Sequence, residues 1–318
     1  MKKLLSTLLL VIFAISALGA CGANDSGENA DNTKINIGVM AGPTGMGMAK
    51  LMSDAADASE KYAFEIYSAP TNATADLGSG ALDMLCLPTN TAAALANKQP
   101  DFITVLAVNT LGSLYLLTDE NTEITSVSDL EGKTIYASVP SSTTGPIINY
   151  LLEANNVNAT IEFETDHDAL VAKVKDGSAP IVVLPEPKVT AALTQNKSYS
   201  IDLNLSTEWS KVSSTPLTMG CIVVRNDFLK EHKSVVDNFL VEYKASIEYV
   251  NTPENLSSAA QMIVDGGVIP ALSVATKSLT NLYGSIVYLD GANMKSALEN
   301  FYDAIDLKKP DSSFYYEK

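Results

Sequence analysis

Two short turns in this chain are rich in the groups that hold a small ligand through hydrogen bonds. Residues 41–47 contain three glycines, which let backbone N–H groups come close to a bound anion or carbonyl. Residues 138–145 carry four consecutive hydroxyl side chains ahead of Pro146, more than a helix N-cap requires. Both turns are therefore predicted to bind a solute. The alternatives are a tight turn whose glycines serve only the backbone, and helix capping.

Similar turns follow other apolar runs, and one of them places Glu186 between two prolines. Its carboxylate could pair with an amine or amidine of a ligand, or it could be a solvated carboxylate neutralised by Lys188. The flexible Met46 would add an adaptable apolar wall. The predicted ligand-binding residues are Gly42, Pro43, Thr44, Gly45, Met46, Tyr67, Pro88, Thr89, Asn90, Asn109, Thr110, Ser141, Ser142, Thr143, Thr144, Pro185 and Glu186.

Residues suited to catalysis or to metal binding are sparse. His167 and His232 lie in polar stretches with no nucleophile motif or further metal ligand nearby, so both are predicted as surface histidines. No Walker loop, nucleophile elbow or zinc helix motif occurs. We therefore predict no catalytic residue, no metal and no cofactor. Arg225 is the only arginine, which counts against amino-acid ligands and leaves the charge of the solute open.

Composition excludes some partners. The chain has 37 Asp and Glu against 21 Lys and Arg, a formal net charge of −16, so nucleic acid is not expected to bind. A hydrophobic fraction of 46% fits a globular body with a proper core. Cys86 and Cys221 each lie in an apolar stretch and are predicted to be buried free thiols, although a disulfide between them stays open.

The N-terminus carries an export signal. Two lysines precede an apolar run at 4–17, and small residues then lead to Cys21. This pattern predicts a lipoprotein signal peptide at 1–20, with Cys21 as the lipidated first mature residue. Residues 21–33 then form a polar tether that holds a folded body at the membrane. An uncleaved anchor helix is the alternative, but the apolar run is short for a membrane span.

Apolar runs alternate with helical patterns from Lys34 onward, which predicts an α/β fold with parallel sheets. The strands are predicted at 35–40, 64–67, 84–87, 104–108, 114–117, 134–137, 181–184 and 218–225. The helices are predicted at 45–61, 91–96, 146–154, 233–249, 256–265 and 293–302.

Two connecting strands, at 113–118 and 219–224, bracket the middle of the chain. The chain is therefore expected to build one lobe from 34–112 and 225–318 and a second lobe, including the hinge strands, from 113–224. Loops at the carboxyl ends of parallel strands would then face a shared cleft, which is where open α/β sheets bind ligands.

The lipobox, the tether, the glycine turn at 42–47, and the segments 130–132 and 224–228 together resemble the substrate-binding lipoproteins of ABC importers. The chain is most similar to the branch for nitrate, sulfonates, taurine and thiamine-pyrimidine precursors, over nearly all of 34–318. The resemblance implies a type II periplasmic-binding-protein fold. It also implies a monomer, lipid-anchored on the extracytoplasmic face, that closes around a small solute and delivers it to a permease driven by an ATPase.

Two other functions stay open. One is an enzyme of the same fold that acts on a small heterocycle, for which Glu186 is the only candidate acid or base. The pyrimidine-synthesising enzymes of this fold use a cysteine-rich iron motif, and the chain has no such cluster, so we expect no enzyme. The other is a surface lipoprotein that binds a protein partner, which would have a cleft filled by its own side chains.

Overall fold

A computed structural model describes residues 33–58, 60–138 and 143–317, and residues 33–318 form one compact unit. The predicted signal peptide, Cys21 and nearly all of the tether lie outside the described residues, as do Ser141 and Ser142. No helix within the described ranges is both long and apolar enough to cross a bilayer.

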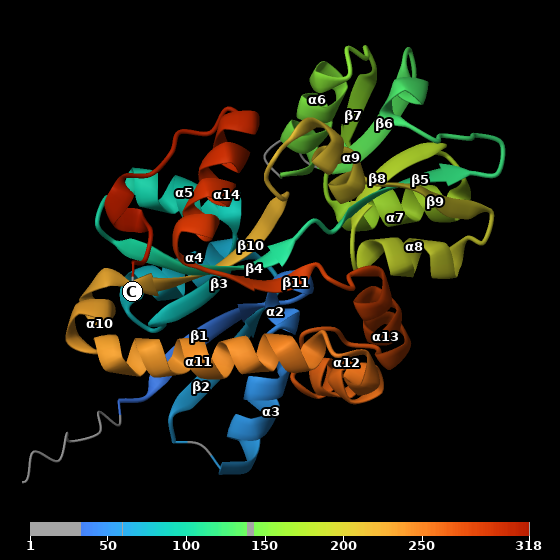
Figure 1. The fold of residues 1–318 in the computed structure, drawn as a ribbon. Coiled ribbons are helices and arrows are strands. Elements are labelled where there is room, and N and C mark those ends of the chain that lie inside the picture. The colour runs from blue at the N-terminus through green and yellow to red at the C-terminus, as the bar shows by residue number, and fades with distance from the viewer. Residues whose placement is uncertain (1–32, 59, 139–142, 318) are drawn as a thin grey trace, which may run out of the picture. The chain divides into compact units, whose positions relative to one another are not determined.

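A six-stranded sheet forms the first half of the fold (Figure 1). Strand β1 pairs in parallel with β2 and β3, whereas β10 runs antiparallel to both β3 and β4. The strands in spatial order are β11 (Ile286–Leu289), β4 (Ile103–Leu111), β10 (Thr218–Arg225), β3 (Met84–Pro88), β1 (Ile35–Met40) and β2 (Tyr62–Tyr67).

A five-stranded sheet forms the second half. Here β6 is parallel to β7 and β8, and β5 is antiparallel to β8 and β9. The strands in spatial order are β7 (Thr160–Glu164), β6 (Thr134–Ser138), β8 (Ile181–Pro185), β5 (Leu114–Asp119) and β9 (Tyr199–Asn204). Each sheet thus has a parallel part, and the predicted α/β fold with two sheets is confirmed.

The chain crosses between the sheets twice. It passes from β4 to β5 through Gly112 and Ser113 alone, and it returns to β10 through α9 (Leu205–Val212). The amide of Gly112 donates to the carbonyl of Leu217 over 2.8 Å, so the two crossings lie side by side. Strand β10 belongs to the six-stranded sheet, although the sequence predicts a second lobe that runs to residue 224. This difference arises because β10 pairs with β3 and β4 along most of its length.

Helices cover both faces of the six-stranded sheet (Figure 1). The long α11 shows why: its buried Val236, Phe239, Tyr243 and Ile247 recur at three- and four-residue spacing and form one apolar stripe. Burying a side chain such as Phe239 contributes about 1.5–3 kcal/mol. The helices of this half are α2 (Pro43–Met46), α3 (Ala49–Ala58), α4 (Pro70–Ser79), α5 (Thr89–Lys98), α10 (Asn226–Glu231), α11 (Lys233–Val250), α12 (Leu256–Asp265), α13 (Leu272–Asn281) and α14 (Gly291–Ala304).

The single helix predicted at 45–61 is wrong, because α2 and α3 are separate helices with a break at Gly47. A Cβ on Gly47 would lie 2.7 Å from the side chain of Ile247, so the break allows a close approach to α11. The helices that pack on the second sheet are α6 (Thr144–Ala154), α7 (His167–Asp176), α8 (Lys188–Gln195) and α9.

Candidate functional site

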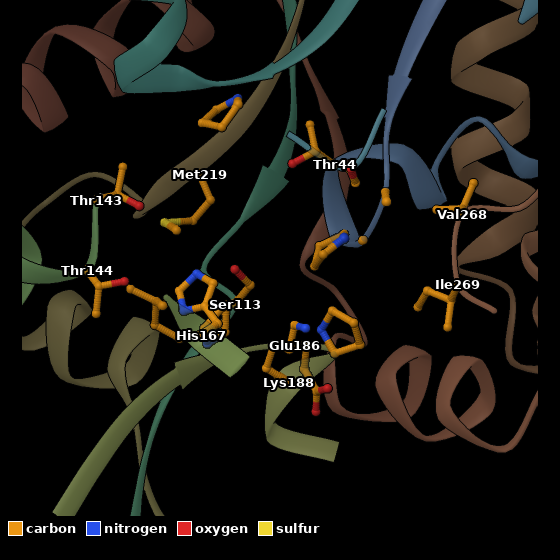
Figure 2. A pocket seen from close by; sticks show the side chains of 18 of the residues that line it. Thr44, Ser113, Thr143, Thr144, His167, Glu186, Lys188, Met219, Val268 and Ile269 are labelled. Atoms are coloured by element: carbon orange, nitrogen blue, oxygen red, sulfur yellow. The ribbon is translucent and has the colours of Figure 1, made fainter. Parts of the chain in front are cut away.

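A pocket of about 420 Å³ has walls from both sheets (Figure 2). The first half supplies the turn after β1, the residue after β2, the end of β3, the start of β10 and the loop before α13. These residues are Ala41, Gly42, Pro43, Thr44, Ser68, Pro88, Met219, Val268, Ile269 and Pro270.

The second half supplies one crossing between the sheets and the turns that enter three helices. These residues are Ser113, Leu114, Thr143, Thr144, His167, Pro185, Glu186, Pro187 and Lys188. Figure 2 shows Thr143 and Thr144 at one side of the pocket and Val268 and Ile269 at the other.

Three helices of the second half begin at this pocket. Thr144, His167 and Lys188 are the first residues of α6, α7 and α8, and all three line the wall. This convergence follows from topology, because the preceding strands β7, β6 and β8 are parallel and end at one edge of the sheet. A helix N-terminus carries a partial positive charge and free N–H groups. The pocket can therefore bind an electronegative group without an arginine.

The glycine turn after β1 is fastened from two sides. The side-chain amide of Asn109 donates to the carbonyl of Thr44 over 3.1 Å, and the amide of Gly42 donates to the carbonyl of Val268 over 3.1 Å. Gly42 has a φ of 97°, and a Cβ on Gly45 would lie 2.2 Å from the carbonyl oxygen of Met40. Both positions therefore require glycine, and the turn is a preformed part of the wall.

Glu186 is buried in the wall, with only 1% of its surface exposed. Its Oε1 accepts hydrogen bonds from the Thr190 hydroxyl over 3.0 Å and from the Asn281 amide. Its Oε2 accepts from the Ser278 hydroxyl over 3.0 Å and from the Thr190 backbone amide over 3.4 Å. The alternative of a solvated carboxylate is wrong. Protein donors already occupy both oxygens that were predicted to meet a ligand amine.

Lys188 and His167 are two further ionisable residues of the same wall. The ammonium of Lys188 pairs with the carboxylate of Asp168. No hydrogen-bond partner within the described part of the chain reaches the buried Nδ1 of His167. Burial lowers the pKa of His167, and the positive charge of Lys188 lowers it further, against the opposing effect of two aspartates. His167 is therefore partly buried in the wall of the pocket, which differs from the freely exposed surface histidine that was predicted.

The structure brings about half of the predicted binding residues to the pocket. Gly42, Pro43, Thr44, Pro88, Thr143, Thr144, Pro185 and Glu186 line it. Ser141 and Ser142 lie outside the described residues, and the other seven lie beneath or beside the wall: Gly45, Met46, Tyr67, Thr89, Asn90, Asn109 and Thr110.

Three of those other residues have hydrogen-bond partners within the fold that explain their position. Tyr67 donates to the Asp76 carboxylate over 2.8 Å, and Thr89 donates to the carbonyl of Thr218 over 3.1 Å. Asn109 supports the glycine turn, as described above. These side chains position the wall from behind.

Several wall residues were missed by sequence reasoning. Ser68 and Lys188 lie in turns at 67–71 and 184–188 that sequence reasoning identified after strands, but neither was included among the predicted binding residues. His167 follows β7, a strand that sequence reasoning did not predict. Ser113 and the loop at 268–270 carry no local signal, because only the tertiary fold brings them to the pocket. Within the described ranges, no three His, Cys, Asp or Glu side chains gather in a way that could hold a metal.

Comparison with known proteins places this geometry in a family. Residues 48–271 match the model of a family described as "ABC transporter, phosphonate, periplasmic substrate-binding protein". Comparison of the sequence with curated proteins gave no significant match.

Many solved structures share the fold. An ABC transporter protein from Parabacteroides distasonis has a TM-score of 0.72 at 20% identity, over 90% of this chain and 99% of that one. The zinc-bound ligand-binding component of an ABC-type import system from Staphylococcus aureus has a TM-score of 0.69 at 14% identity, over 90% and 97%. The periplasmic aliphatic sulphonate binding protein from Escherichia coli has a TM-score of 0.67 at 15% identity, over 89% and 92%.

These structural likenesses confirm the predicted periplasmic-binding-protein fold, and at such identities they establish the fold alone. The family match spans well over half of the chain. The protein therefore belongs to the phosphonate family of periplasmic substrate-binding proteins of ABC transporters, which confirms the relationship to ABC importers that its sequence implied.

Proposed function

We propose that this protein is the extracytoplasmic solute-binding lipoprotein of an ABC importer, which captures a small solute between its two halves and delivers it to the permease. The observation that carries the proposal is the pocket of about 420 Å³ with walls from both sheets. A solute that contacts both walls favours the arrangement in which they face each other, by its differential affinity for that state. The importer's ATPase, and not this protein, would supply the energy of transport.

The lining indicates the chemistry of the solute. Most of the wall is aliphatic, with Pro43, Leu114, Met219 and Ile269 among its residues, and the described lining contains no Phe, Tyr, Trp or Arg. The volume lies within the range of pockets for small organic molecules. We therefore propose a solute with one oxyanion group held at the helix N-termini and an aliphatic part held by the apolar wall. Alkyl phosphonates and alkyl sulfonates have this chemistry.

Membrane attachment would come from the N-terminus. The proposed signal peptide at 1–20 ends before Cys21, whose thiol would carry lipid, and residues 21–33 would serve as the tether. Such an anchor keeps the binding protein near its permease and raises its effective concentration there. The geometry offers no support to the enzyme alternative, because protein donors already surround the carboxylate of Glu186, the only candidate acid or base.

Ligand-dependent stability tests the proposal. The chain from residue 22 onward is purified, stripped of carried-over ligand, and melted against alkyl phosphonates, alkyl sulfonates, nitrate, aminopyrimidines and amino acids. A solute that binds only the folded state raises its stability by about 2.7 kcal/mol at a hundredfold excess over Kd. A saturable shift with the phosphonates or sulfonates, matched by calorimetry, is expected. A folded protein that responds to no member of the panel would contradict solute binding and favour the protein-binding alternative.

Anchoring is tested separately. The full chain and its Cys21→Ser variant are expressed, and membrane and soluble fractions are compared. Lipidation predicts a membrane-bound wild-type protein whose mass exceeds that of the cleaved chain, whereas the variant should keep its signal or leave the membrane. Equal masses after correction for the substitution would contradict the lipid anchor.

A further inference from the structure

Helix α13 contacts both halves of the fold. Its Ala275 and Leu279 are buried in the core between the six-stranded sheet and α11 and α12. Its last residue, Asn281, is held by the other half, because the hydroxyl of Tyr115 on β5 donates to the Asn281 carbonyl over 2.6 Å. The helix is therefore anchored in one half by apolar packing and tied to the other half by polar groups.

The second connection between α13 and the five-stranded half is made by the carboxylate of Glu186, which accepts two hydrogen bonds from the helix. Glu186 follows β8 of the five-stranded sheet, and its amide donates to the carbonyl of Ser113 over 2.9 Å. Across the boundary its two oxygens accept from Ser278 and Asn281 of α13, and on its own side they accept from Thr190. Two of these groups, the backbone amide of Thr190 and the side-chain amide of Asn281, can only donate through their N–H groups. An ionised carboxylate suits them because it only accepts hydrogen bonds, whereas a glutamine amide brings donors of its own.

The same helix controls one wall of the pocket. Val268, Ile269 and Pro270 line the pocket, and only Ala271 separates them from the first residue of α13. The carbonyl of Val268 also accepts from Gly42 in the glycine turn. A shift of α13 relative to the five-stranded sheet would therefore move this wall away from His167 and Lys188 on the opposite side.

We propose that Glu186 is a positioning residue of the pocket, whose carboxylate fastens α13 and the wall at 268–270 to the five-stranded sheet. The hydrogen bonds of this carboxylate hold the two walls at the spacing that a solute bridges, and Glu186 does not contact the solute. Removing these bonds lowers the fraction of molecules with a competent pocket, and the apparent affinity falls by that fraction. This affinity effect rests on the proposed solute-binding function, but the effect on α13 does not.

Amide hydrogen exchange on the solute-free protein tests the proposal directly. Glu186→Gln keeps the size of the side chain but turns an N–H group toward the amide of Asn281 or of Thr190, so the amides of α13 are expected to exchange about tenfold faster. Glu208→Gln is the matched control, since Glu208 is also a buried glutamate but pairs with Lys211 on α9. That control should leave exchange in α13 unchanged.

A rescue variant separates positioning from general damage. In Glu186→Gln combined with Asn281→Asp, the new carboxylate accepts from the glutamine amide, so α13 should regain most of its protection. Should Glu186→Gln fail to fold, Ser278→Ala removes one donor from the α13 side and serves the same test. Exchange in α13 at the wild-type rate in Glu186→Gln or in Ser278→Ala would overturn the proposal. So would a double variant whose α13 amides exchange as fast as those of Glu186→Gln.

Solute affinity gives the second readout, with ethylphosphonate and ethanesulfonate as probes in calorimetry. Glu186→Gln is expected to raise the Kd about tenfold, and the double variant to restore it. Unchanged affinity in a Glu186→Gln protein with a loosened α13 would overturn the link to the pocket. If neither probe binds wild-type protein while α13 loosens and is rescued as expected, the proposed solute class fails and the fastening role of Glu186 stands.

Discussion

Asn109, at the end of β4, donates its side-chain amide to the carbonyl of Thr44, while its own Oδ1 accepts from the Thr110 hydroxyl over 3.0 Å. The side chain is 1% exposed, so water cannot replace either bond. Asn109→Leu removes both and leaves the carbonyl and the hydroxyl without these partners, which should cost about 1–3 kcal/mol for each unsatisfied group. Urea unfolding measures this loss, with Asn97→Leu as the control, because the hydrogen bond from Asn97 to the Lys308 carbonyl is exposed to solvent. Wild-type stability would contradict a supporting role.

Gly45 lies beneath the pocket, and its lack of a side chain is required. A Cβ there would lie 2.2 Å from the Met40 carbonyl oxygen, and backbone atoms cannot move aside as a flexible side chain can. We expect Gly45→Ala to reduce the yield of folded protein or to lower its melting temperature by many degrees. Gly78→Ala in α4 is the matched control, because nothing lies within 4 Å of its Cβ. It should be neutral or stabilise by about 0.5–1 kcal/mol.

The two described cysteines are buried and do not form a disulfide with each other. Cys86 and Cys221 lie on neighbouring strands, but Cys86 packs into the core with α11, and Cys221 packs into the core on the other face. Both are free thiols, so the alternative of a disulfide between them is wrong. Burial raises the pKa of Cys86 to about 12 and that of Cys221 as well, which suppresses the reactive thiolate.

The chain from residue 22 onward should therefore resist a thiol reagent such as a maleimide while folded, and should take up two labels after unfolding in urea. Mass spectrometry counts the labels. Rapid labelling of the folded protein would contradict the burial of these thiols, and an absence of labelling after unfolding would point to a disulfide.

Acid should weaken the fold through His167. Its pKa in the folded protein lies below the ordinary value of 6.5, because burial disfavours the charged imidazolium. Between those two pKa values the unfolded chain binds more protons, so stability rises with pH. The contribution is present above about pH 6.5 and is lost as the pH falls through that value toward the folded pKa.

Thermal melts from about pH 5 to about pH 8 measure this dependence. His167→Gln should flatten the acid side of the profile, while His232→Gln serves as the control. Identical slopes for wild type and His167→Gln would contradict the depressed pKa. Because His167 lines the pocket, an anionic solute should also stabilise its charged form, so proton uptake on binding is expected at acid pH.

The sequence predicts the interior strands well because their apolar runs are continuous. Strands β1, β3 and β8 are buried along nearly their whole length, and their predicted positions agree with the structure to within a residue at each end. Strand β7 was missed because it is an edge strand, and its charged and exposed residues conceal the alternation. Missing β7 also hid the turn into α7, and with it His167. Edge strands and the sites that follow them are thus the weak point of hydrophobic patterning.

The candidate site was also predicted only in part from the sequence. Turns that follow a well-predicted strand, such as those at Thr44 and Thr144, were identified because glycine and hydroxyl residues accumulate there. Glu186 was identified as a site residue, but its partners were not, because Ser278 and Asn281 lie far away in the sequence. Residue type predicts which groups can bind, whereas tertiary packing decides which of them remain free to do so.

The hydrogen bond between Gly112 and Leu217 has a consequence for how the molecule is assembled. Strands β4 and β10 are antiparallel neighbours, so topologically residues 113–217 are the loop of one β-hairpin. A loop of that length is costly to close while it is disordered, and much less so once it has folded with its two ends adjacent. Residues 113–217 are thus one continuous insert in the chain that builds the six-stranded sheet. A folded insert with ends at that spacing, and with partners for Ser278 and Asn281 of α13, could replace it, which would exchange half of the pocket in one step.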